Sequence, residues 1–221
     1  MAINTYTTLI SAIGNYMHRS DLTGRDSEAI AMVEAKVNRR FRLRGMEATA
    51  TGNMVAGTAT ISLPTGFLEH RSLTYVPVTG AVRKLEFVTL EQADAYEFTT
   101  SGLPAVFTFA GGAIRLYPTP DSTYAYTLKY YGQVSALTSG TVSTNFLLAS
   151  HPDVYLYGSL VEMCQFTGDD PRLASWKASL EEALRELERA DRRERFTSPR
   201  VGFDSELAAF PSSRNIETDG E

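Results

Sequence analysis

The 221-residue sequence contains one cysteine, Cys164, and three histidines, His18, His70 and His151. A single thiol excludes an intramolecular disulfide, and it cannot by itself form a thiolate cage for a metal ion. The histidines lie in separate segments, so a site built from them would require the fold to bring them together. We therefore expect no metal and no cofactor.

Long apolar runs and an excess of positive charge are also missing. No uninterrupted apolar stretch approaches the roughly 18–20 residues that span a bilayer, and no basic segment precedes an apolar one, since the first basic residue is Arg19. The chain carries 21 basic and 26 acidic residues, a net charge of −5. This balance gives no general attraction to nucleic acid or anionic lipid. We expect a protein made in the cytoplasm, without membrane contact or sequence-specific DNA binding.

Hydrophobic spacing predicts two helices in the first 45 residues. Apolar residues recur every three or four positions over residues 5–18, which is the spacing of one helix face. A second helix is predicted to be capped by Asp26 or Ser27. We expect it to end near Arg44-Gly45, because glycine tolerates a left-handed residue at a helix end.

The period changes between residues 47 and 133, where threonine, valine and aromatic residues alternate with polar ones. Gly111-Gly112 separates two such segments and predicts a hairpin turn. A short helix fits residues 89–98. The predicted antiparallel strands cover residues 47–51, 58–63, 70–77, 82–86, 106–109, 112–117 and 124–131.

Helical spacing returns over residues 149–167 and again from 171 to about 195, with a break at 168–170. The sequence therefore predicts an α+β fold in which a bundle of about four helices carries an inserted small antiparallel β domain. The expected parts are N-terminal helices (1–45), the β domain (46–133), C-terminal helices (134–196) and an extended C-terminal tail (197–221).

Few residues in the sequence suggest catalysis or metal or phosphate binding. No phosphate-binding glycine loop and no zinc spacing is present in the sequence. The carboxylate pairs Asp169-Asp170 and Glu181-Glu182 could serve as acid and base in glycoside cleavage, although Asp169-Asp170 also suits helix capping. Cys164 lies in an apolar helical segment, which is typical of a small core side chain. We therefore predict no catalytic residue and no enzymatic activity.

The densest charge feature is a group of four arginines, Arg39, Arg40, Arg42 and Arg44, at the end of the second helix. Cations complement the negative end of a helix dipole, and arginine also makes bidentate contacts with carboxylates and phosphates. In an acidic chain we expect these arginines to contact another protein or another copy of the chain.

The last segment, residues 197–221, is rich in serine, proline and charge, and it predicts an extended tail. Phe203, Leu207 and Phe210 are apolar anchors in this tail, as expected of an arm that becomes ordered on docking.

Several phrases occur in a characteristic order. They are YTTLISAI (6–13), AKVNRRFRLR (35–44), ISLPTGF (61–67), GAIRLYPTPD (112–121), Tyr130-Tyr131, Leu137 and TNFLLASHPDVYLYGSL (144–160). Together they resemble the head-to-tail adaptor, or connector, proteins of tailed bacteriophages. The resemblance spans most of residues 5–190 and rests on the order and spacing of all the phrases.

The resemblance implies a non-catalytic virion structural protein, assembled in the host cytoplasm and located in the virion neck. Such adaptors form a ring, usually of twelve copies, below the portal, and DNA passes through the ring without sequence-specific binding. The implied partners are the portal protein, other copies of the chain and a downstream tail or nozzle protein. Two alternatives stay open: a virion-associated cell-wall glycosidase, and a tail-completion or stopper ring protein.

In this family a C-terminal arm commonly reaches onto the portal. By resemblance, the arm is residues 197–221, and its portal-binding residues are Arg200, Phe203, Leu207 and Phe210. The group of Arg39, Arg40, Arg42 and Arg44 is then expected at an intersubunit or portal contact.

Overall fold

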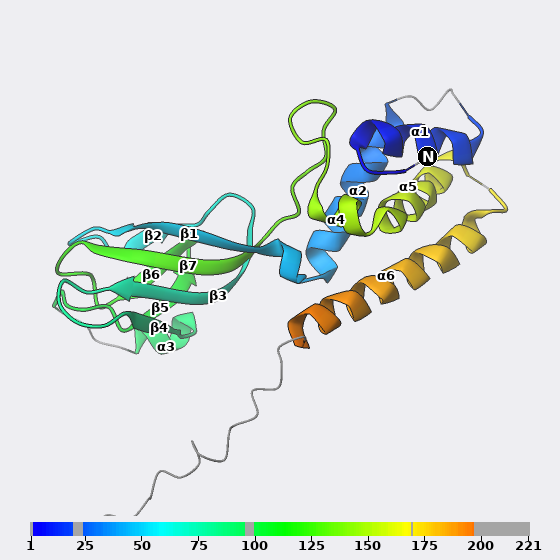
Figure 1. Cartoon of the computed structure of the whole chain (residues 1–221). Helices are drawn as coiled ribbons and strands as arrows, with labels where there is room; N and C mark the ends of the chain where they lie inside the picture. Colours follow the sequence, from blue (N-terminus) through cyan, green and yellow to red (C-terminus); the bar gives the residue numbers. More distant parts are fainter. Residues whose placement is uncertain (1, 20–23, 96–99, 169, 197–221) are drawn as a thin grey trace, which may run out of the picture.

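The structure, a computed structural model, describes residues 2–19, 24–95, 100–168 and 170–196. Within these ranges the chain forms six α-helices and seven strands, so the fold is α+β as predicted (Figure 1). The helices are α1 (Tyr6–Met17), α2 (Arg25–Arg40), α3 (Leu90–Asp94), α4 (Phe146–Ser150), α5 (Pro152–Thr167) and α6 (Leu173–Phe196). The strands are β1 (Glu47–Met54), β2 (Thr60–Ser62), β3 (Phe67–Val76), β4 (Arg83–Phe87), β5 (Val106–Ala110), β6 (Ala113–Tyr117) and β7 (Tyr124–Gly132).

The helical part lies at one end of the molecule and is built around α5 (Figure 1). Residues on every side of α5 are buried, among them Val154, Tyr155 and Leu160, and α5 packs against α1, α2, α4 and α6. A helix that is apolar on all sides belongs in the centre of a core. The predicted helix over 149–167 is α5, which begins at Pro152, and a separate short helix, α4, precedes it, because proline restricts the residue before it.

The predicted limits of the second helix were wrong at both ends. α2 is preceded by Gly24, with φ of 94°, and not by a side-chain cap from Asp26 or Ser27. It ends at Arg40 and not near Gly45, because Phe41 turns into an extended, buried position. The guanidinium group of Arg42 then donates to the carbonyls of Asn38 (2.8 Å) and Phe41 (2.7 Å), which satisfies groups that a helix end leaves free.

All seven predicted strands are present, in the order β1-β7-β3-β4-β5-β6-β2. Gly111 and Gly112 form the predicted turn between β5 and β6, with φ of 59° and 74°. One pairing differs from the expected antiparallel pattern, since β4 and β5 are parallel. Parallel neighbours need a crossover, and the segment that contains α3 supplies it.

The sheet closes over a core of its own. Every strand contributes to one buried cluster, whose members include Met54 of β1, Ile61 of β2, Leu73 of β3 and Phe107 of β5. Sharing one cluster among seven strands requires the sheet to curl around it. None of the helices in the described ranges is both long and apolar enough to cross a membrane.

Candidate functional site

The arginine-rich end of α2 lies where the helical part, the sheet and the end of α6 meet. Arg42 donates from Nε to Glu69 of β3 at 3.0 Å. Arg40 lies 3.7 Å from a carboxylate oxygen of Glu188 on α6, and its guanidinium group covers the ring of Phe41 at 5.1 Å. These arginines therefore connect α2 to two elements that are distant in the sequence.

Arg44 attaches the last turns of α6 to the same place. Its backbone N–H donates to Asp191 at 2.6 Å, and its guanidinium group donates to the carbonyl of Glu194 at 3.0 Å. Arg195 completes the junction: it pairs with Asp191 at 2.7 Å, donates to the carbonyl of Arg42 and lies over the ring of Tyr131 at 5.9 Å. We call this set of contacts the α2–α6 junction.

Arg39 differs from the other three predicted arginines. It is exposed, and no hydrogen bond or ion pair links it to another residue in the described ranges. The other predicted binding residues, Arg200, Phe203, Leu207 and Phe210, lie outside the described residues.

Arg39 lies on the rim of a groove of about 430 Å³ between α2, α5 and α6. Its apolar lining consists of Val33, Val37, Phe41, Val154, Leu180 and Leu184, with Gly158 between them. Its charged residues are Lys36, Arg39, Arg40, Glu162 and Glu181. We call this hollow the α2–α5–α6 groove. An apolar lining with a charged rim is typical of a protein interaction surface.

Glu34 forms a buried polar contact on the buried face of α2, beside Ile30, Val33 and Val37. Its carboxylate accepts from the backbone N–H of Leu137 (2.9 Å) and from the Tyr155 hydroxyl (3.1 Å), to which Asn145 also donates (2.7 Å). Burial raises the pKa of the Glu34 carboxyl group, and these two hydrogen bonds oppose that rise. Glu34 therefore fixes the loop between β7 and α4 to the helical core. Sequence reasoning missed this residue.

The sequence profile of the SU10 adaptor protein family matches residues 4–202. The chain belongs to this family. The family is one of phage head-tail adaptors, so the resemblance found in the sequence is confirmed. A search of curated proteins finds no match to the chain.

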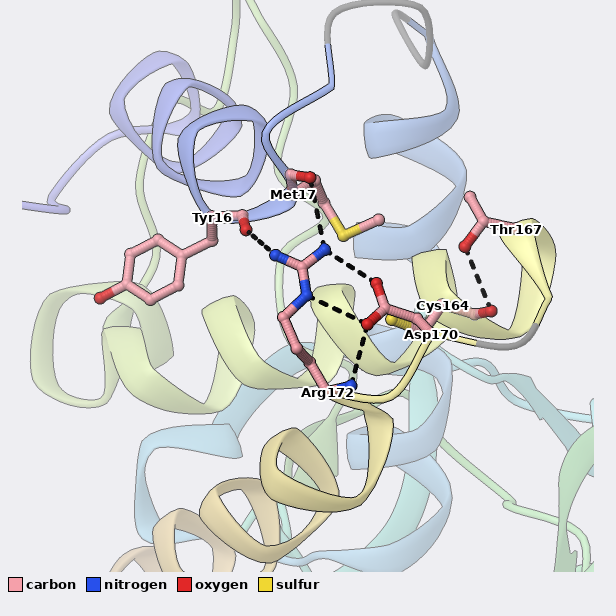
Figure 2. A network of polar contacts seen from close by, with 6 residues as sticks. All are labelled: Tyr16, Met17, Cys164, Thr167, Asp170 and Arg172. Carbon is pink, nitrogen blue, oxygen red and sulfur yellow. Dashed lines mark hydrogen bonds and ion pairs between the residues drawn. The ribbon is translucent and has the colours of Figure 1, made fainter.

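In this adaptor, Asp170, which was considered as a catalytic carboxylate, takes part in contacts that hold two helices together. Arg172 lies between the end of α1 and the start of α6 (Figure 2) and donates to the carbonyl of Tyr16 (2.9 Å) and to both oxygens of Asp170 (3.0 and 2.8 Å). Its guanidinium group also lies 4.6 Å from the ring centre of Trp176. The hydrogen bonds from Arg172 hold the pKa of Asp170 far below its usual range. Asp170 is thus an anion that holds Arg172 in place, and Arg172 joins the end of α1 to the start of α6.

Cys164 is buried on α5 next to this network. Burial raises the pKa of its thiol to about 11, and the neighbouring Asp170 adds to the effect. A nucleophilic cysteine needs the opposite shift, so Cys164 is held as a neutral core thiol.

The remaining candidates do not come together in the fold. His18 follows α1, His151 lies between α4 and α5, and His70 packs on β3 against three phenylalanines. The described residues contain no group of three or more His, Cys, Asp or Glu that could hold a metal ion. Glu181 lies on the rim of the α2–α5–α6 groove, and Asp169 lies outside the described residues.

Proposed function

We propose that this adaptor assembles as a ring of twelve copies below the portal, where it extends the DNA channel and gives the tail a docking surface. The family match over residues 4–202 is the observation that carries the proposal. A closed ring requires each copy to present two different, mutually complementary surfaces. The helical part at one end of the chain and the sheet at the other are two different surfaces that copies could present (Figure 1).

The proposed partners are the portal protein, neighbouring copies and a downstream tail or nozzle protein. DNA would pass without sequence-specific binding, because a chain of net charge −5 repels phosphate more than it attracts it. No enzymatic step is part of this function.

For contacts between copies or with the portal, Arg39 is the best placed of the four arginines. Arg40, Arg42 and Arg44 already have partners within the chain, and in our proposal they hold the surface on which Arg39 lies. The arm, residues 197–221, would bind the portal through Arg200, Phe203, Leu207 and Phe210.

Cryo-electron microscopy of the native particle neck, with tagged copies of this chain, tests the proposal. We expect a closed ring beneath the portal with residues 197–221 lying along the portal. A ring that contacts only tail proteins would instead make the chain a tail-completion or stopper protein. Failure to enter particles would overturn the adaptor function, and a peptidoglycan-clearing assay would then test the glycosidase alternative.

The role of Arg39 is tested by Arg39→Glu, with Lys177→Glu as a matched charge reversal at an exposed position of α6. We expect Arg39→Glu to reduce incorporation into particles and Lys177→Glu to leave it unchanged. Equal incorporation of both variants would exclude Arg39 from the contact.

A further inference from the structure

One long edge of the sheet has no neighbouring strand. β1 and β2 are the first and last strands in the sheet order, and β1 pairs with β7 on one side only (Figure 1). Within the described residues, no backbone hydrogen bond other than those to β7 involves residues 48–53. The backbone groups of successive residues point to alternate sides of a strand. Every second residue of β1 therefore presents its N–H and C=O groups to this open edge.

β1 lacks the features by which proteins usually protect an edge strand. It is eight residues long, it pairs with β7 without a bulge from Glu47 to Met54, and it contains no proline and no lysine. Its one charged side chain, Glu47, forms an ion pair with Arg71. The opposite edge differs, because β2 has only three residues. Of the two edges, β1 is the one long and regular enough to pair with a further strand.

The core of the sheet is incompletely covered beside this edge. The core-facing side chains of β1 are mostly small, and Ala48 and Ala50 are only partly buried there. The ring of Tyr126 lies close against Gly52 of β1, and it is also only partly buried. By contrast, Leu73 in the middle of the sheet is fully buried. Apolar surface next to β1 is therefore available for a neighbour to cover.

The backbone and the side chains of this edge select the same kind of partner. A straight row of unpaired N–H and C=O groups is satisfied by another extended chain, which adds to the sheet as a strand. Side chains of an added strand alternate between the two faces of the sheet, so every second one would lie against the partly covered core. The others would lie beside the exposed residues Thr49, Thr51 and Asn53. The matching partner is an extended segment with apolar and polar residues in alternation.

We propose that the open edge of β1 binds an extended segment of another protein, which becomes the eighth strand of the sheet. β1 supplies the backbone hydrogen bonds, and Ala48, Ala50 and Tyr126 supply the apolar surface for alternate side chains of the segment. The segment has no proline at its paired positions, because proline has no N–H to donate. This inference concerns the β part of the chain and stands whether or not the chain assembles as a ring.

A strand-forming peptide added to the full-length chain tests the site. The probe is acetyl-Lys-Thr-Val-Thr-Val-Thr-Val-Lys-amide, and NMR measures hydrogen exchange of the β1 amides. In the free chain, amides that face the open edge should exchange fast and those bonded to β7 slowly. At about 1 mM peptide, we expect exchange of the open-edge amides to slow roughly tenfold. The same peptide with proline in place of its second and third threonines is the control and should have no effect.

Two charge variants locate the added strand. Ala50→Lys puts an ammonium group on the core side of β1 next to the open edge, where it hinders an apolar strand, so the slowing should disappear. Thr51→Lys puts the same charge on the next residue, which is on the exposed face, and the slowing should persist. Slow exchange of the Leu73 amide in β3 checks that both variants keep the folded sheet.

Several results would overturn the proposal. Unchanged exchange of the open-edge amides with the valine peptide would mean that β1 accepts no strand, and equal slowing by the proline peptide would mean a contact of another kind. Equal slowing in the two lysine variants would exclude packing of the segment against the core. Slowing that grows with chain concentration in the absence of peptide would mean that a second copy fills the edge.

Discussion

Replacing Glu34 by alanine tests whether the buried hydrogen bonds of this residue stabilise the helical core. The change removes the acceptor for two buried donors, the Leu137 amide and the Tyr155 hydroxyl. An unsatisfied buried donor costs about 1–3 kcal/mol, while removal of a poorly solvated carboxylate returns part of that cost. We expect the free energy of unfolding to fall by roughly 2–4 kcal/mol, which lowers Tm by about 4–16 °C in a chain of this size.

Glu34→Gln is the matched control, because its amide oxygen can still accept a hydrogen bond without a buried charge. We expect its stability at pH 7 to be within about 1 kcal/mol of the native chain. Urea unfolding followed by the fluorescence of Trp176 measures both variants, since Trp176 is the only tryptophan and belongs to the same core as the helices. An alanine variant as stable as the native chain, or a glutamine variant as weak as alanine, would refute the reasoning.

The native chain and Glu34→Gln should differ in how their stability depends on pH. Burial raises the pKa of Glu34 above its ordinary value of 4.5, so the folded state binds the proton more tightly than the unfolded state. The resulting stabilisation is complete below pH 4.5 and disappears as the pH rises through the folded-state pKa. Relative to Glu34→Gln, the native chain should therefore lose stability as the pH increases above 4.5.

Three other predictions concern separate parts of the chain. Gly45→Ala should destabilise the fold by about 1–3 kcal/mol, because the added Cβ would overlap the ring of Phe146. Urea unfolding should show a smaller destabilisation when the same substitution is made in a Phe146→Ala background. Asp191→Ala removes the acceptor of the Arg44 amide, so hydrogen exchange in the last two turns of α6 should become roughly two- to tenfold faster, and unchanged exchange would contradict the junction. Burial raises the pKa of Cys164 to about 11, so its thiolate fraction should be about 100-fold lower than that of a thiol with pKa 9. Iodoacetamide should therefore modify Cys164 slowly in the folded chain and rapidly in urea. Equal rates would contradict its burial.

Local patterns in the sequence were sufficient for most of the secondary structure. Alternation and glycine turns depend on neighbouring residues only, and they predicted all seven strands and the Gly111-Gly112 hairpin. A signal for Glu34 was also present, because it lies within the apolar helical stripe of Ile30, Val33 and Val37. A carboxylate at such a position indicates a buried partner elsewhere in the chain.

The predictions from sequence were wrong where a distant residue or a crossover determined the local structure. The sequence predicted that α2 ends near Gly45, because glycine tolerates a left-handed residue at a helix end. The helix instead ends at Arg40, because Phe41 is buried in the core and the Arg42 side chain donates to the free carbonyls. The parallel pairing of β4 and β5 follows from the path of the segment between them. Residue spacing within a strand contains no information about the direction of its neighbour.

The sequence by itself determined the α+β class, the positions of most elements and the family, because these follow from hydrophobic period and from the order of short motifs. Only the tertiary structure decided how the four arginines are used. Glu69, Glu188 and Asp191 are far from α2 in the chain, and folding alone brings them against Arg42, Arg40 and the Arg44 backbone while leaving Arg39 on the groove rim. Which charged residues pair across long stretches of sequence depends on how the elements pack, and neither composition nor residue spacing carries that information.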